Sequence, residues 1–192
     1  MKQIFILALC ILSLNTQAQR HSENSKGFEF SGGFMDNTQF PPDDNGAFAL
    51  NLSYSSYLST KSYYKIGVNL NQKSYLVEDN LTAPVMTYFL DSKYFYSVFS
   101  NGKKSFFVNV GGGGFMGFEN AKKLKEAYAE RYYSTDLKNN RFIYGLNAGV
   151  ELECFFTSRF GMVANLGESV IFNSNLSKWH TYLLVGFKYL IF

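Results

Sequence analysis

The chain has 192 residues and a formal net charge of +3, with 20 Phe, 14 Tyr and 16 Gly beside only 3 Pro. This length suits one domain better than two, and the aromatic-rich, proline-poor composition favours strands over helices. Lys and Arg are scattered among acidic residues, so the sequence lacks the basic patch that direct nucleic-acid binding requires.

The first residues follow the order of a secretory signal peptide. Lys2 precedes an apolar run at 4–14, and small and polar residues lead from there to Ala18. The run is shorter than the roughly 20 apolar residues of a membrane-spanning helix. Residues 1–18 are therefore expected to be a signal peptide, and residues 19–192 an exported domain.

Cysteine and histidine are too few to build a site. Lipidation at Cys10 is an alternative to signal cleavage, although Leu9 is large where a lipobox needs a small residue. Once the signal is removed, Cys154 is the only cysteine and has no disulfide partner in the chain. His21 and His180 make no metal-ligand spacing with it. We expect no disulfide, metal or cofactor.

Eight segments alternate apolar and polar residues with a period of two, the pattern of half-buried strands. In chain order they are residues 26–35, 47–58, 63–73, 86–98, 106–119, 141–154, 159–167 and 180–192. In the first of them, Phe28 and Phe30 lie on one side and Glu29 on the other. Segments of about ten residues have the length with which a tilted strand crosses the hydrocarbon core of a membrane.

The fifth segment contains four consecutive glycines. Gly112, Gly114 and Gly117 match the dinucleotide fingerprint, with Asp136 about 20 residues further on. A phosphate site needs a helix that opens at the glycines, but residues 115–119 continue the period of a strand. We therefore interpret the run as packing: alternate glycines give room to inward side chains, and the others leave a notch on the outside.

The seven connections alternate between long and short without exception. They are residues 36–46, 59–62, 75–84, 100–104, 120–140, 157–159 and 172–179. Outer-membrane barrels have this alternation, with tight periplasmic turns and longer external loops, whereas a β-sandwich gives no reason for it. The sequence predicts an all-β fold, an eight-stranded antiparallel up-and-down transmembrane β-barrel in outer-membrane lipid of a Gram-negative bacterium.

Charged residues gather on the inward face of the predicted strands. They are Glu29, Lys65, Asp91, Lys93, Glu151, Glu153 and Lys188. Side chains fill the interior of an eight-stranded barrel, and unpaired buried charges are costly. We expect a polar network that closes the lumen, with a proton or ion pathway as the alternative.

The longest connection, residues 120–140, has the composition of a helix. Leu124, Tyr128 and Tyr132 would form an apolar stripe at positions i, i+4 and i+8. The stripe suits two roles equally well, a helix folded over the barrel mouth or a contact with a partner protein.

Catalysis has weaker support. Ser169, Ser177 and His180 lie near the predicted external rim and could supply a nucleophile and a base for a lipid-modifying barrel. No motif fixes their geometry, and no small-molecule substrate is indicated. We expect a protein that is not an enzyme.

Four segments resemble one known family. They are residues 19–34 (QRHSENSKGFEFSGGF), 117–121 (GFENA), 141–160 (RFIYGLNAGVELECFFTSRF) and 185–189 (VGFKY). Their content and order are similar to the conjugative-transposon TraO family. The resemblance implies an exported, outer-membrane component of a mating apparatus, with other conjugative transfer proteins as partners and no catalytic residues. A generic small outer-membrane barrel, structural or adhesive, is the alternative.

Overall fold

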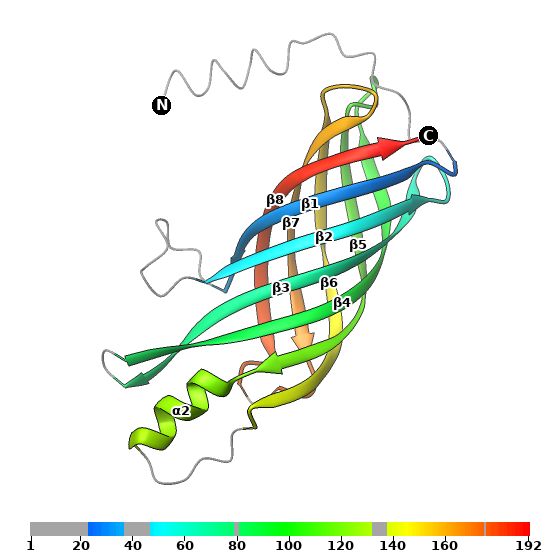
Figure 1. Cartoon of the computed structure of the whole chain (residues 1–192). Helices are drawn as coiled ribbons and strands as arrows, with labels where there is room; N and C mark the ends of the chain where they lie inside the picture. Colours follow the sequence, from blue (N-terminus) through cyan, green and yellow to red (C-terminus); the bar gives the residue numbers. More distant parts are fainter. Residues whose placement is uncertain (1–22, 37–46, 79–80, 132–137, 175) are drawn as a thin grey trace, which may run out of the picture.

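The computed structural model describes residues 23–36, 47–78, 81–131, 138–174 and 176–192. Eight strands pair antiparallel in chain order, and β8 pairs back with β1, so the sheet closes into a barrel (Figure 1). The strands are β1 (Lys26–Met35), β2 (Phe48–Tyr57), β3 (Ser62–Glu78), β4 (Leu81–Ser100), β5 (Phe106–Asn120), β6 (Asn140–Phe155), β7 (Phe160–Ile171) and β8 (Trp179–Ile191). The predicted fold class is confirmed.

Residue alternation decides which side chains face the interior. Along β8, every second residue is buried and its neighbours are exposed, so Leu184 and Lys188 point inward while Val185 points outward. Successive residues of a strand point to opposite faces. The outer face therefore carries large apolar side chains, and the polar residues line the inside.

The two ends of the barrel differ. One end, called here the turn rim, holds the connections 58–61, 101–105 and 156–159 together with the chain's C-terminus (Figure 1). The opposite end is called the loop rim. Helix α2 (Lys122–Arg131), which follows β5, lies at the loop rim. Among the described residues, no helix is long and apolar enough to cross a membrane.

One predicted loop is a pair of strands. Residues 75–84 were expected to form a long connection, but β3 and β4 continue their ladder through Tyr75 and its partner Ala83. Beyond Gln72, β3 has no β2 partner, and before Met86, β4 has no β5 partner. This two-stranded ribbon projects from the loop rim (Figure 1).

Pro84 explains why the sequence is misleading at this point. Proline interrupts a central strand because it has no N–H to donate, but an edge strand tolerates it. Since β5 does not reach Pro84, the strand is an edge there. The loop-like composition of the ribbon is therefore compatible with strand pairing.

The core is divided into layers along the barrel axis. The turn-rim layer is a cluster of Tyr57, Tyr63, Phe95, Phe107, Phe155 and Leu190. Two apolar clusters lie further toward the loop rim; they are Met35, Ala49, Tyr182 and Leu184, and Phe89, Phe115, Ile143 and Ile171. Buried polar and charged side chains occupy the remaining interior positions.

Candidate functional site

The seven charged residues of the inward register all lie inside the barrel. Glu29, Lys65, Asp91, Glu151, Glu153 and Lys188 are each at most 4 % exposed, and Lys93 is 12 % exposed. The strands β1, β3, β4, β6 and β8 supply them, so residues up to 159 positions apart in sequence share one interior layer.

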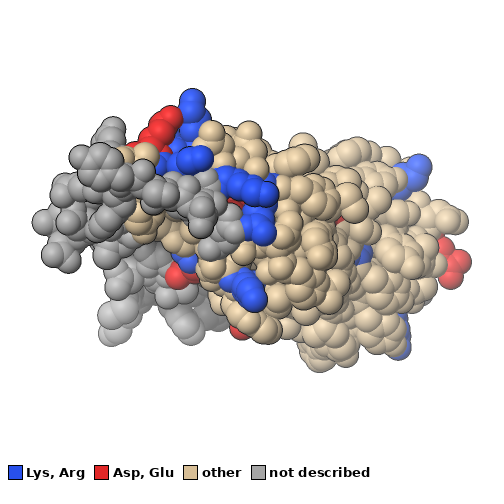
Figure 2. Space-filling model, turned by 90° about the horizontal axis from the view of Figure 1, so that it is seen from below, with Lys and Arg blue, Asp and Glu red and all other residues tan. Residues whose placement is uncertain are grey.

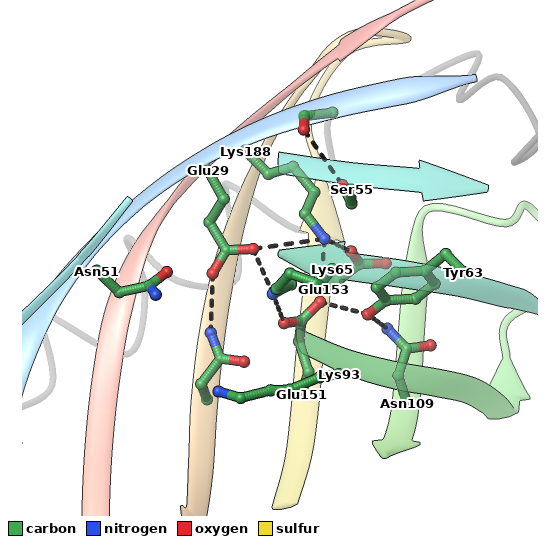
Figure 3. A network of polar contacts seen from close by, with 12 residues as sticks. Glu29, Asn51, Ser55, Tyr63, Lys65, Lys93, Asn109, Glu151, Glu153 and Lys188 are labelled. Atoms are coloured by element: carbon green, nitrogen blue, oxygen red, sulfur yellow. Dashed lines mark hydrogen bonds and ion pairs between the residues drawn. The ribbon is translucent and has the colours of Figure 1, made fainter. Parts of the chain in front are cut away.

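Five of these residues form one network, in which two lysines serve three carboxylates (Figure 3). Lys65 Nζ donates to Glu29 Oε2 at 2.6 Å and also contacts Glu151 Oε2. Lys188 Nζ donates to Glu151 Oε1 at 3.0 Å, contacts Glu153 Oε1, and lies 3.5 Å from Glu29 Oε2. Charge-assisted bonds of this kind are the stronger class of hydrogen bond.

Neutral groups complete the network. Tyr63 Oη donates to Glu151 Oε1 at 2.5 Å, and Tyr57 Oη donates to Glu153 Oε1 at 3.2 Å. Asn165 Nδ2 donates to the second oxygen of Glu29 at 3.1 Å. The tyrosines belong to the turn-rim cluster, so that aromatic layer also supports the carboxylates beneath it.

The remaining two charges form a pair of their own. Lys93 Nζ lies 2.8 Å from Asp91 Oδ2 and 5.2 Å from the centre of the Tyr182 ring. Four carboxylates therefore face three lysines inside the barrel. The interior layer carries one excess negative charge when all seven groups are ionised.

Two cavities inside the barrel are small. They lie on the loop-rim side and have volumes of about 20 Å³ and 10 Å³. Asn71 and Ser169 line both of them. A cavity needs about 10–15 Å³ to hold one water molecule. Within the described residues, these spaces suit single waters rather than a substrate.

Among the described residues, no hydrogen bond joins a ring nitrogen of His180 to the hydroxyl of Ser169 or Ser177. His180 Nδ1 lies 2.5 Å from Asp36 Oδ2, and His180 Nε2 lies 3.0 Å from the backbone oxygen of Ser177. The Ser177 hydroxyl instead donates to the backbone oxygen of Trp179. Ser169 is opposite His180 in the β7–β8 ladder and is buried. Both nitrogens of the ring are therefore occupied by acceptors.

Asp36 ties the end of β1 to two other strands. Its carboxylate accepts from Lys73 Nζ at 2.7 Å and from the backbone N–H of Thr181 at 2.7 Å, besides its contact with His180. Burial alone would raise the pKa of Asp36, but the bonds from His180 and Lys73 outweigh it and hold the pKa below its usual value. The cluster is a structural clasp at the loop rim.

The predicted apolar stripe of the loop helix packs onto the barrel's own ribbon. Leu124 is 1 % exposed and lies in a cluster with Ala83 and Val85, and Tyr128 packs against the same cluster. Tyr132 lies outside the described residues. In this conformation, the two described members of the stripe face the β3–β4 ribbon rather than solvent.

Exposed aromatic side chains form a belt near each end of the outer face. At the turn rim they include Tyr64, Tyr94, Tyr96, Phe160, Phe187 and Tyr189, and at the loop rim Tyr88, Phe118, Phe142, Tyr144, Phe172 and Trp179. Between the belts the exposed residues are mainly aliphatic. Figure 2 shows this uncharged band across the middle of the molecule, with most charged residues toward the ends.

One charged residue lies within the apolar outer face, away from the strand ends. Among strand positions whose side chains are described, only Lys26, at the very start of β1, and Glu168 carry a charge on the outward side. Glu168 is exposed and lies on β7, four residues before Phe172 of the loop-rim belt. The sequence reading missed it because the seventh segment was ended at Gly167, one residue too early. The period of two, extended through Val170, would have found it.

The wall beside Glu168 is hollowed. A surface hollow of about 420 Å³ is lined by Leu146, Ala148, Glu168, Val170 and Trp179 among others. A second hollow of about 640 Å³, lined in part by Gly114, Met116 and Phe172, also borders Leu146. These two adjoining depressions are called here the outer hollow. Of Gly112 and Gly114, the two glycines predicted to leave a notch outside, Gly114 lines the outer hollow and Gly112 does not.

Other functional chemistry is not evident in the described part of the chain. It contains no group of three or more His, Cys, Asp or Glu residues that could hold a metal ion. Cys154 is a free thiol, half-buried on β6.

Two solved outer-membrane proteins share the fold. OprG of Pseudomonas aeruginosa superposes with a TM-score of 0.55 at 12 % identity, over 92 % of this chain and 99 % of its own. Ail, the attachment invasion locus protein of Yersinia pestis, superposes with a TM-score of 0.52 at 11 % identity, over 88 % of this chain and 99 % of its own. At such low identity the likeness concerns the fold alone. No curated protein sequence matches the chain.

The fold alone does not show to which family the chain belongs, but a family model does. The model described as "Conjugative transposon protein TraO" matches residues 23–191. The match spans all eight strands and includes most of the segments that resemble this family. The chain therefore belongs to the TraO family of conjugative transposon proteins.

Proposed function

We propose that this protein is a non-enzymatic, outer-membrane component of the apparatus that transfers a conjugative transposon between cells. The observation that carries the proposal is a closed barrel with an apolar, aromatic-belted outer face in a chain of the TraO family. An apolar band flanked by aromatic girdles is the surface of an outer-membrane barrel. Export by residues 1–18, which lie outside the described residues, completes this proposal.

The observations support a role in binding other molecules more than a catalytic role. The interior charges are ion-paired, and the free spaces among the described residues suit single waters. The ring nitrogens of His180 are both occupied. A barrel without a substrate site acts through its surfaces, in contact with outer-membrane lipid and with other transfer proteins.

The test is an in-frame deletion of the gene in a donor that carries the complete conjugative element. We expect the number of transconjugants per donor to fall below detection and to return when the gene is supplied in trans. Donor growth and detergent resistance serve as controls for general damage to the envelope. Transfer at the parental frequency in the deletion strain would refute the proposal.

A further inference from the structure

Glu168 is a carboxylate on the face that the proposed function places in lipid. It has no ion-pair or hydrogen-bond partner among the described residues, in contrast to the seven interior charges. Its ladder partners are Ala148 and Thr181, neither of which carries a charge. An ionisable side chain within a membrane is costly and points to a functional contact.

The outer hollow beside Glu168 is not required by the barrel's own packing. A Cβ at Gly114 would meet nothing closer than the backbone oxygen of Gly145 at 3.6 Å, so a larger residue fits there without strain. By contrast, a Cβ at inward-facing Gly113 or Gly145 would collide with backbone of the neighbouring strand. The inward glycines allow close packing of neighbouring strands. The small residues Gly114 and Ala148 instead leave a depression in the outer surface.

Protein segments within a membrane often contact one another at small residues that lie beside a polar side chain. Small residues let two backbones approach closely, and a polar pair between the segments adds specificity. A lipid acyl chain fills an apolar hollow equally well but leaves the carboxylate without a partner. Headgroups lie outside the aromatic belt, while Glu168 lies on the inner side of Trp179 along the β7–β8 ladder.

The outer strand wall of a second copy of this chain does not supply the missing charge. On the outward face of the described strands, the only cation is Lys26, which lies at the turn rim, at the opposite end of the barrel. The exposed Lys178 lies at the loop rim, on the outer side of Trp179, and therefore outside the band that contains Glu168. We infer that the cation comes from a different chain.

We propose that Glu168 and the outer hollow form a lateral docking site, within the membrane, for a segment of another transfer protein that carries a Lys or Arg side chain. The small residues Gly114 and Ala148 accept the segment, and the carboxylate pairs with its cation. This site rests on the proposed function and names the chemistry of the partner.

The experiment is photo-crosslinking in living donor cells with a photoreactive amino acid at Val170, which lines the hollow. Val150, an outward valine of β6 that does not line it, is the matched control position. We expect a crosslink from Val170 alone to a protein encoded by the conjugative element. Glu168→Gln is expected to lower its yield about three- to tenfold.

Filling the hollow gives a second readout with its own control. Ala148→Leu is expected to lower crosslinking and transfer, whereas Ala164→Leu, on the outer face of β7 away from the hollow, leaves both unchanged. Transfer lost in Glu168→Lys is expected to return when the partner's Lys or Arg is changed to Glu. All variants are compared at equal amounts of folded barrel.

Three results would overturn the docking site: a Val170 crosslink that Glu168→Gln does not weaken, a crosslink only to a second copy of this chain, or no protein crosslink at all. Each is separable from failure of the proposed function. If deletion of the gene abolishes transfer while Glu168→Gln and Ala148→Leu support it fully, the function stands and the docking site is wrong.

Discussion

At the scale of single residues, the interior is stabilised by charges that depend on one another. Lys188 contacts three carboxylates, and all four side chains are at most 2 % exposed, so its removal leaves Glu151 and Glu153 short of a counter-ion. Pairing of buried charges contributes little net stability, but removal of one partner is expensive because the other charge stays buried. The network therefore fixes which side chains share the lumen rather than adding a large stabilisation.

Lys188→Met is expected to destabilise the folded barrel by about 3–5 kcal/mol, the cost of breaking a buried ion pair. Guanidinium-induced unfolding in lipid vesicles measures this difference. Lys103→Met, in an exposed turn at the turn rim, is the matched control and should change stability by less than about 0.5 kcal/mol. Equal effects of the two substitutions would show that the interior layer is hydrated and loosely paired.

The outer register makes a second prediction at this scale. Val68→Arg places a cation in the apolar band, where the ladder partners of Val68 are Leu52 and Leu90, and is expected to cost about 2–4 kcal/mol. Phe118→Arg, in the loop-rim belt, should cost about 0–1 kcal/mol. The folded fraction can be read from the difference in gel mobility between heated and unheated samples. A larger effect at Phe118 than at Val68 would place the membrane band elsewhere on the barrel.

At the scale of elements, helix α2 depends on the ribbon for its position. Its first turn carries Lys122 and Lys123 and no acidic residue, so the helix lacks the favourable charge that the helix dipole prefers at an N-terminus. Packing of Leu124 against Ala83 and Val85 offsets this weakness. The ribbon and the helix form one unit at the loop rim.

Leu124→Ala is expected to release α2 without opening the barrel. Removal of a buried leucine side chain costs about 2–5 kcal/mol, more than an isolated ten-residue helix can supply. Hydrogen exchange should become faster in α2 and in the ribbon, while β6 to β8 keep their protection. Unchanged exchange in α2, or a loss of protection throughout the barrel, would contradict this assignment.

The Asp36 clasp predicts a pH dependence at the loop rim. Because its pKa is lowered in the folded protein from the ordinary value of 3.8, ionised Asp36 stabilises the clasp above that value. This stabilisation is lost as the pH falls through the folded pKa. We expect protection of the Thr181 amide, which donates to Asp36, to drop only below about pH 4. In Asp36→Asn the drop should be absent; if it persists, another group controls the clasp.

At the scale of the whole molecule, a filled lumen separates this barrel from a porin. Eight strands leave an interior only wide enough for side chains, and here an aromatic layer and an ionic layer occupy it in turn. In planar bilayers the purified protein is expected to give no steady conductance at neutral pH. Large, stable channels would show that copies assemble around a wider pore.

Residue patterns were enough to predict the barrel. Alternation within each strand and the lengths of the connections can be read locally, and together they indicate an up-and-down barrel. They also placed Glu29 and Lys188 inside. They did not show that Lys188 reaches Glu151, because that contact crosses β7 and depends on the registers of two strand pairs. The sequence did not predict that β3 and β4 pair beyond the barrel, because Pro84 is typical of a loop. It did not single out Glu168, because the seventh segment was ended one residue before it.

The central claim is that this TraO-family chain is an outer-membrane barrel, and sedimentation of donor-cell membranes on a density gradient tests it most directly. The protein should be recovered in the dense outer-membrane fraction, and unheated samples should migrate on gels as a compact, detergent-resistant species that heating converts to the unfolded form. Recovery in the soluble periplasmic fraction or the inner membrane, or the same mobility before and after heating, would contradict it.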